Sequence, residues 1–245
     1  MNQSVLQPPS SVKWDRNPAR DPLSTDSPIN RASPALDGLS LKFAMWAGRV
    51  TAPCLDVGCG SGVATRAALA RGAHVIAVDP DLSMLHQLLT HLPVNQFGRI
   101  SANSARLEEL DLAAGELAAV HISRVLHFLD GDAVQRGFSD ISRWLQPEGK
   151  LFLSALTPAG SYWKGFNAEF SRRARLGDRW PGYIDDVSRY DLASQPGTTC
   201  HLLSEAVLMR ELRAVGFEIE ELVTYSLAWD VAQSCCGIVA RWPHR

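Results

Sequence analysis

Apolar runs alternate with amphipathic stretches from residue 53 to residue 215, and this alternation constrains the fold more than any other feature of the chain. Apolar runs of strand length lie at 53–57, 73–78, 98–102, 117–123 and 149–156. Stretches with helical spacing lie at 62–71, 81–91, 130–146 and 204–215. Such an alternation predicts a parallel sheet with helices on both faces. We therefore expect a doubly wound α/β fold, with a turn at 147–149 before the fifth strand.

The two ends of this region complete the predicted sheet. Apolar residues between Leu36 and Val50 recur at helical spacing, so a helix should precede the first strand. The segments 217–225 and 236–242 are predicted as two successive strands with no helix between them. One of these two can lie antiparallel at or near the sheet edge. The expected sheet is therefore mostly parallel and seven-stranded, with an antiparallel C-terminal strand.

Two segments depart from the alternation. Residues 1–34 contain six prolines among polar residues, which predicts either a disordered arm or an arm that folds over a pocket, anchored by Trp14. Residues 157–203 form a connection between the fifth strand and the last helix that is far longer than usual and rich in aromatic residues. We expect this segment to be a cap inserted into a single domain at 35–245.

The first predicted strand runs directly into the loop Gly58-Cys59-Gly60-Ser61-Gly62, after which a helix begins. Ligands of open α/β sheets bind beyond the carboxyl ends of the strands, and glycine allows close backbone approach. Dinucleotides and S-adenosylmethionine both fit this architecture. Asp56 opposes a pyrophosphate but attracts the cationic groups of S-adenosylmethionine. The dinucleotide fingerprint also requires a glycine where this chain has Val63.

A second carboxylate, Asp79, ends the second predicted strand. An acid at this position can accept hydrogen bonds from both hydroxyls of a ribose. Both candidate cofactors contain that ribose, so Asp79 indicates adenosine binding without discriminating between them. The glycine loop and the acid, in this order and on strand ends, together form a strong signal.

These residues resemble the first two motifs of class I S-adenosylmethionine-dependent methyltransferases, at 55–62 and 77–85. Residues 124–129 and 144–151 resemble the exit from the family's fourth strand and its turn before the fifth. The resemblance implies a Rossmann-like fold, S-adenosyl-L-methionine as the cofactor and methyl transfer as the activity. It covers about 36–156, and 204–242 by topology only. The arm and the cap lie outside it.

The resemblance also assigns the cofactor contacts. They fall at Asp56, Gly58, Cys59 and Gly60 in the loop, at Asp79, Pro80 and Met84 after the second strand, at Asn103, Ser104 and Ala105 after the third, and at Ser123 and Arg124 after the fourth. Asp79 is expected to hold the ribose hydroxyls, with Pro80 and Met84 packing near the adenine. Asn103 stands where the family usually has an aspartate, and its carbonyl can still accept from the adenine amine.

Few residues are expected to take part in the chemistry, because methyl transfer is an in-line displacement that mainly requires positioning. A general base is needed only for a weakly acidic acceptor. His127, just after the fourth strand, is the predicted base, and a structural histidine is the alternative. His201 is a second, more speculative candidate. The segment 121–124 lacks the Asn/Asp-Pro-Pro-Tyr/Phe signature, which disfavours methyltransferases of nucleic acid bases and protein glutamine. No carboxylates cluster near the fourth strand, so no metal is expected.

The cap supplies the predicted substrate contacts, which are Tyr162, Trp163, Trp180, Tyr183 and His201. Such aromatic residues can enclose an apolar, aromatic or cationic substrate, and ordinary packing of the cap on the sheet is the alternative. The basic run 172–179 is most simply a solvated helix face. Its alternative role is attraction of a carboxylate or phosphate on the substrate.

The net charge narrows the classes of partner that the sequence favours, and the cysteine content indicates the compartment. A formal net charge of -2 gives no overall attraction to nucleic acid or an anionic membrane. No apolar run approaches the roughly 18 residues of a membrane span, and no secretory signal is visible. The five cysteines, with Cys235 and Cys236 adjacent, favour reduced thiols in a cytoplasm. The oligomeric state stays open.

The preferred prediction is a cytoplasmic enzyme that methylates an oxygen or nitrogen of a small molecule, for example in natural-product metabolism. A second prediction uses the same cofactor for attack on its aminobutyrate chain, by cyclisation or transfer, with methylthioadenosine as the product. A third is a non-catalytic cofactor-binding regulator. A nicotinamide-dependent dehydrogenase is disfavoured by Asp56 and Val63.

Overall fold

The computed structural model describes residues 36–191, 194–227, 230 and 232–244. The arm predicted at 1–34, with Trp14, lies outside the described residues.

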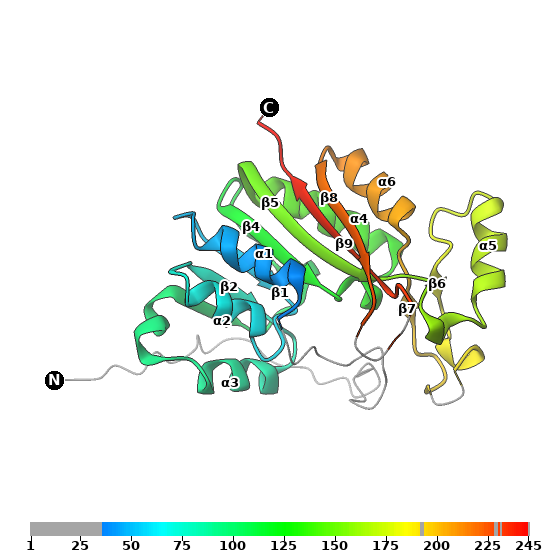
Figure 1. Cartoon of the computed structure of the whole chain (residues 1–245), viewed down its shortest axis with the longest axis horizontal. Helices are drawn as coiled ribbons and strands as arrows, with labels where there is room; N and C mark the ends of the chain where they lie inside the picture. The colour runs from blue at the N-terminus through cyan, green and yellow to red at the C-terminus, as the bar shows by residue number, and fades with distance from the viewer. Residues whose placement is uncertain (1–35, 192–193, 228–229, 231, 245) are drawn as a thin grey trace. The chain divides into compact units, whose positions relative to one another are not determined.

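The described residues form a seven-stranded sheet in the order β3-β2-β1-β4-β5-β9-β8 (Figure 1). Its strands are β1 (Cys54–Val57), β2 (Val75–Val78), β3 (Ile100–Asn103), β4 (Leu117–Ser123), β5 (Leu145–Leu156), β8 (Glu218–Tyr225) and β9 (Cys235–Arg241). Strands β1 to β5 pair in parallel, and β9 is antiparallel to both β5 and β8. The predicted Rossmann-like fold is confirmed, with the antiparallel strand next to the edge. The strand order reverses between β1 and β4, where such sheets bind ligands.

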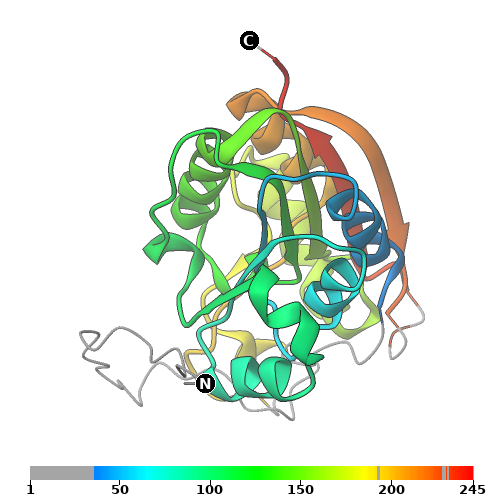
Figure 2. The same cartoon turned by 90° about the vertical axis from the view of Figure 1, so that its left-hand side faces the viewer.

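Helices cover both faces of the sheet, as Figure 2 shows. On one face lie α1 (Gly38–Ala47), α2 (Val63–Leu69) and α3 (Leu82–Thr90), and on the other lie α4 (Gly131–Trp144) and α6 (Glu205–Val215). Separate apolar clusters fill the two interfaces. Four of the helices begin where a side-chain oxygen accepts from a backbone amide of the first turn, namely at Asp37, Asp81, Asp130 and Ser204. The core therefore has two parts, one on each side of the sheet.

The shorter connections contain short 3-10 helices. These are η3 (Val94–Arg99), η4 (Leu107–Glu109) and η5 (Leu126–Phe128). The turn predicted at 147–149 is instead a bulge within β5. Leu117 of β4 pairs with Leu145, but Ala119 pairs with Lys150, so the intervening residues of β5 have no partner on β4. Glu148 in this bulge has a left-handed φ of 68°.

Segment 157–203 has secondary structure of its own. It contains η6 (Ser161–Trp163), α5 (Asn167–Arg175), η7 (Val187–Arg189) and an antiparallel ribbon of β6 (Tyr183–Ile184) and β7 (Cys200–His201). The ribbon and α5 lie beyond the end of β5 (Figure 1). The Leu203 amide donates to the Leu156 carbonyl at 2.8 Å, which brings the chain back to that strand end. The segment is therefore positioned at the carboxyl edge of the sheet, where the ligand crevice lies.

Candidate functional site

The glycine loop leaves β1 with three left-handed residues: Gly58, Gly60 and Gly62 have φ values of 64°, 52° and 80°. A Cβ at Gly58 would lie 2.3 Å from the Val125 side chain, and one at Gly62 would lie 2.2 Å from Leu88. A Cβ at Gly60 would meet no described atom within 4 Å. The outer glycines are therefore required by packing, and Gly60 leaves an open approach to the backbone.

Asp79 borders this open position from the end of β2. Its Oδ2 accepts from the Gly60 amide at 2.9 Å, and its Oδ1 accepts from the Asp81 amide at 2.9 Å. Burial raises the pKa of the Asp79 carboxyl, and the negative charges of Asp81 and Asp56 raise it further. The carboxylate therefore lies in a negative environment that a cationic ligand would relieve.

Asp56 lies behind the loop and has internal partners at both carboxylate oxygens. Its Oδ1 is 2.7 Å from Nδ1 of His121, and its Oδ2 accepts from the Thr65 hydroxyl at 2.5 Å. The side chain is buried, with 1% of the residue exposed. The sequence predicts direct contact with the cofactor, whereas the structure bonds this carboxylate to β4 and α2.

His121 and Thr65 are functional candidates that the sequence reasoning missed. The available signal was a single histidine inside the otherwise apolar run 117–123. In the parallel register of β1 and β4, His121 is the direct neighbour of Asp56. Thr65 has no comparable signal, because it is an ordinary residue of α2 until the carboxylate beside it is known.

The predicted adenine-side residues gather at the carboxyl ends of β2 and β3. The Asp79 amide donates to the Asn103 carbonyl at 3.3 Å, and the Ser104 hydroxyl donates to the Pro80 carbonyl at 3.2 Å. Pro80 and Asn103 are exposed, while Met84, Ser104 and Ala105 are half-buried. These five positions are therefore accessible from one edge of the sheet.

Cys59 lies inside the loop, where its amide donates to the Val78 carbonyl at 3.0 Å. Burial raises the pKa of its thiol, and the charges of Asp56 and Asp79 add to this effect. The thiol is therefore protonated at neutral pH, and Cys59 contributes to the loop through its backbone.

The exit of β4 lies next to the glycine loop. Ser123 and Ser154 share a hydrogen bond between their hydroxyls at 2.8 Å, and the Arg124 amide donates to the Ser154 carbonyl at 2.8 Å. Arg124 has a left-handed φ of 55°, which turns the chain sharply after the strand. The following residue, Val125, is the one that faces Gly58. This turn therefore joins the loop to η5.

The two candidate histidines meet at η5. His127 lies in this turn with 2% of the residue exposed, and its ring centroid is 3.9 Å from that of Phe128. His201, on β7, places Nδ1 2.9 Å from the carbonyl oxygen of Leu129, the residue that ends η5. A carbonyl only accepts, so Nδ1 of His201 carries the hydrogen. Burial lowers the pKa of His201, and no group of the described residues bonds its Nε2.

The cap aromatics separate into two groups. Trp180 and Tyr183 meet the His201 ring edge to face, with centroids 5.2 and 5.5 Å away. Tyr162 and Trp163 form another edge-to-face pair at 5.0 Å, and the Tyr162 hydroxyl donates to Asp191. Two of the five predicted substrate contacts therefore pack against the imidazole of a third, His201. Trp163 is buried, and Tyr162 is half-buried.

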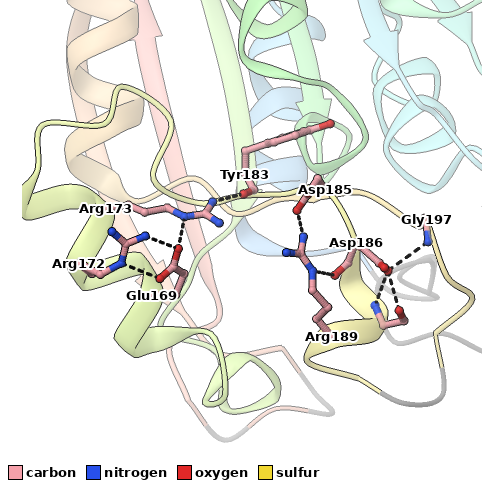
Figure 3. Close-up of polar contacts among 9 residues, drawn as sticks. Glu169, Arg172, Arg173, Tyr183, Asp185, Asp186, Arg189 and Gly197 are labelled. Carbon is pink, nitrogen blue, oxygen red and sulfur yellow. Dashed lines mark hydrogen bonds and ion pairs between the residues drawn. The ribbon is translucent and has the colours of Figure 1, made fainter.

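Two arginines of the basic run, Arg172 and Arg173, are engaged within the cap (Figure 3). Glu169 on α5 accepts from both Arg172 and Arg173, at 2.8 and 2.7 Å. Arg173 also donates to the Tyr183 carbonyl at 2.6 Å, which links α5 to the ribbon. Arg189 forms an ion pair with Asp185. The helix α5 has no buried residue, so this part of the run lies on a solvated face.

Three further observations concern the described part of the chain. No three histidine, cysteine, aspartate or glutamate residues gather there as they would around a metal ion. No helix there has both the length and the apolar character needed to cross a membrane. All five cysteines are free and buried.

The strand order, the single antiparallel strand and the glycine loop at the carboxyl edge together define the class I methyltransferase fold. Solved methyltransferases share it. An S-adenosylmethionine-dependent methyltransferase from Mesorhizobium loti superposes with a TM-score of 0.62 at 21% identity, over 84% of this chain and 100% of its own. The 1,6-didemethyltoxoflavin-N1-methyltransferase of Burkholderia thailandensis, with bound 1,6-didemethyltoxoflavin and S-adenosylhomocysteine, gives 0.60 at 17% identity, over 84% and 79%.

The sequence comparison specifies the family of this domain. Residues 54–149 match the family model described as a methyltransferase domain. The ubiquinone biosynthesis O-methyltransferase of Xanthomonas oryzae pv. oryzae is 33% identical over 172 residues, which are 65% of this chain and 63% of that protein. The chain thus carries a methyltransferase domain with the fold of solved S-adenosylmethionine-dependent methyltransferases, and it spans less than two thirds of this relative's length.

Proposed function

We propose that this chain transfers a methyl group from S-adenosylmethionine to an oxygen or nitrogen of a small molecule. The observation that carries the proposal is the open backbone at Gly60, whose amide donates to the Asp79 carboxylate, with the buried Asp56 carboxylate near enough to raise the pKa of Asp79. Two carboxylates at this position repel a pyrophosphate and favour a ligand with an ammonium and a sulfonium. The relatives and the shared fold support the same assignment.

The residues present fit this cofactor. Asp79 would accept the ribose hydroxyls, and the backbone from Gly58 to Gly60 would line the sugar and the amino acid part. Asn103 would accept from the adenine amine, with Pro80, Met84, Ser104 and Ala105 around the base, and Ser123 and Arg124 would face the methionine end. When bound, S-adenosylmethionine supplies an activated methyl group. The protein's task is then to align the acceptor atom with that group.

The acceptor is proposed to bind beneath the 157–203 segment, in a cytoplasmic enzyme of small-molecule metabolism. His201, Trp180 and Tyr183 bring one imidazole and two aromatic rings next to η5, whose His127 stays the proposed general base. His201 is the second candidate, because its Nδ1 is fixed by Leu129 and its Nε2 is then an acceptor. A base in either position would take a proton from a phenol, carboxylic acid or ammonium group.

Product analysis tests this proposal. The purified chain is incubated with S-adenosylmethionine and a panel of small phenols, carboxylic acids and amines, and the nucleoside products are separated and weighed by mass spectrometry. The proposal expects S-adenosylhomocysteine, formed only when an acceptor is present. Methylthioadenosine would indicate attack on the aminobutyrate chain instead. Binding of the cofactor without either product would favour a regulator.

Substitution of the histidines distinguishes the two candidate bases. With an acceptor found, His127→Asn is expected to reduce kcat about 100-fold or more if His127 is the base, and most at pH values where the acceptor is protonated. His201→Asn keeps a donor toward the Leu129 carbonyl but removes the imidazole acceptor. Full turnover of His127→Asn across the pH range would exclude His127, and a loss confined to His201→Asn would assign the role to His201.

A further inference from the structure

A continuous network of buried hydrogen bonds links α1, two neighbouring strands of the sheet and α2. The Ser40 hydroxyl is 3.1 Å from Nε2 of His121, whose Nδ1 is 2.7 Å from Oδ1 of Asp56. Oδ2 of Asp56 accepts from the Thr65 hydroxyl at 2.5 Å. Ser40 and His121 are 6% and 3% exposed, and Thr65 is fully buried. Four elements therefore meet at one carboxylate behind the glycine loop.

The roles of the donors follow from the chemistry of the groups. An ionised carboxylate only accepts, so Nδ1 of His121 and the Thr65 hydroxyl both donate to Asp56. In the neutral imidazole, Nε2 then accepts from the Ser40 hydroxyl. The ring of Phe43 stacks on His121 with centroids 4.8 Å apart and planes 19° from parallel, which fixes the imidazole orientation. Each polar atom named in this hydrogen-bond network thus has a partner, as a buried network requires.

The order serine, histidine, aspartate is also that of a hydrolytic triad, but the location excludes that role. Ser40 lies on the face of α1 that packs against the sheet, next to Phe43 and Ala44 of the apolar cluster. A nucleophile needs access to a substrate carbonyl. The chain of bonds therefore leads away from solvent, toward the loop.

The charge of Asp56 acts on groups of the glycine loop and of the strand end beside it. Asp56 is two residues before Gly58, and its charge contributes to the raised pKa of both the Cys59 thiol and the Asp79 carboxyl. The two donors to Asp56 hold its carboxylate in one place. The ammonium group of a bound amino acid moiety would gain from a carboxylate fixed at this point.

We propose that His121 is a positioning residue of the cofactor site, which holds the Asp56 carboxylate behind Gly58 and so sets the affinity for the amino acid end of the cofactor. The proposal rests on the function proposed above. His121 touches no reacting atom in this scheme, because it acts through Asp56 and the loop. Ser40 and Phe43 orient the imidazole, and Thr65 provides the second anchor of the carboxylate.

The test uses calorimetry to compare the ligand affinities of three proteins, namely the unchanged chain, His121→Asn and His121→Leu. His121→Asn places an amide N–H where Nδ1–H stood, whereas His121→Leu fills the space without a donor. The affinity of each for S-adenosylhomocysteine is compared with that for methylthioadenosine, which shares the nucleoside but lacks the amino acid. We expect His121→Leu to bind S-adenosylhomocysteine at least about tenfold more weakly than the unchanged chain, but to bind methylthioadenosine within threefold of it. We expect His121→Asn to restore the affinity for S-adenosylhomocysteine.

Equal weakening for both ligands would overturn the proposal, since it would indicate a general structural defect. Unchanged affinity of His121→Leu for S-adenosylhomocysteine would overturn it too. If His121→Leu does not fold, Thr65→Val removes the other donor to Asp56 with little change of shape, and the same two-ligand comparison applies. Failure of the unchanged chain to bind S-adenosylhomocysteine would reject the proposed function itself, which is a separate outcome.

Discussion

At the scale of single residues, the site depends on differences between glycines that look alike in the sequence. Gly58 and Gly62 are held by the side chains of Val125 and Leu88, whereas Gly60 faces open space. All three have left-handed backbones. The motif predicts all three glycines, but only the structure separates those needed for packing from the one needed for ligand approach.

Gly60→Ala tests this distinction. The substitution costs about 1 kcal/mol of stability from the left-handed backbone, with no steric clash in the protein. The new methyl group enters the open approach, so we expect S-adenosylhomocysteine affinity to fall at least tenfold. Gly115→Ala is a matched control, because Gly115 also has a left-handed φ, of 69°, and open space, but it precedes β4 at the opposite edge of the sheet. Equal ligand affinity in the two variants would contradict the assignment of Gly60.

Asp79→Asn tests the ribose contact. The carboxylate accepts charge-assisted bonds from hydroxyls, and the amide loses that charge, so the dissociation constant for S-adenosylhomocysteine should rise about tenfold, or about 1.4 kcal/mol. Asp111→Asn, on an exposed side chain, is the control.

The raised pKa of Asp79 also predicts the direction in which the affinity for the cofactor changes with pH. The pKa of Asp79 is raised above 3.8 by burial, and only the ionised form binds well, so affinity should fall as the pH is lowered toward that raised pKa. The asparagine variant should lack this dependence. Calorimetry from pH 8 down to the lowest pH at which the chain stays folded measures both effects, and identical profiles over that range would contradict the role of Asp79.

At the scale of elements, the cap is joined to the rest of the domain by a few specific contacts. His201 bonds the end of η5, and Trp180 lies within 6 Å of the guanidinium groups of Arg179 and Arg210. Both arginines pair with the buried carboxylate of Glu211 on α6. The ribbon thereby holds an imidazole against the turn that follows β4.

His201→Asn tests this anchor through stability. Burial lowers the pKa of His201 below 6.5, so the unfolded chain takes up a proton there before the folded chain does. The contribution of His201 to folding is therefore present above pH 6.5 and is lost as the pH falls toward its lowered pKa. Urea unfolding at pH 7.5 and pH 5.5 should show a larger loss on acidification for the unchanged chain than for His201→Asn. The same loss in both would contradict a buried, neutral His201.

The elements of the methyltransferase fold could be predicted from the sequence, because buried parallel strands and amphipathic helices leave strong periodic signals. The structure of the cap could not. Its strands are two residues long and α5 buries no side chain, so neither leaves a periodic pattern. The sequence predicts a turn where β5 has its bulge at Glu148, since the residues Pro147 and Gly149 that favour turns also favour strand irregularities.

At the scale of the molecule, the sheet order explains why distant segments form one site. The strand order reverses between the neighbouring strands β1 and β4, and a crevice is expected at their carboxyl ends. The glycine loop, Asp79 and the turn containing His127 therefore meet there. The sequence predicted this convergence through the order of its strands. It could not predict the link between Asp56 and His121, 65 positions apart, because that contact depends on the register of two parallel strands.

For the whole molecule, we expect the carboxyl end of the sheet to bind a cationic adenosine cofactor and not a dinucleotide. Calorimetric titration of the same preparation with S-adenosylhomocysteine and with NAD tests it most directly. The Asp79 carboxylate at Gly60 and the buried Asp56 carboxylate behind the loop predict that S-adenosylhomocysteine binds at least tenfold more tightly than NAD. Tighter binding of NAD, or no binding of S-adenosylhomocysteine, would contradict the account.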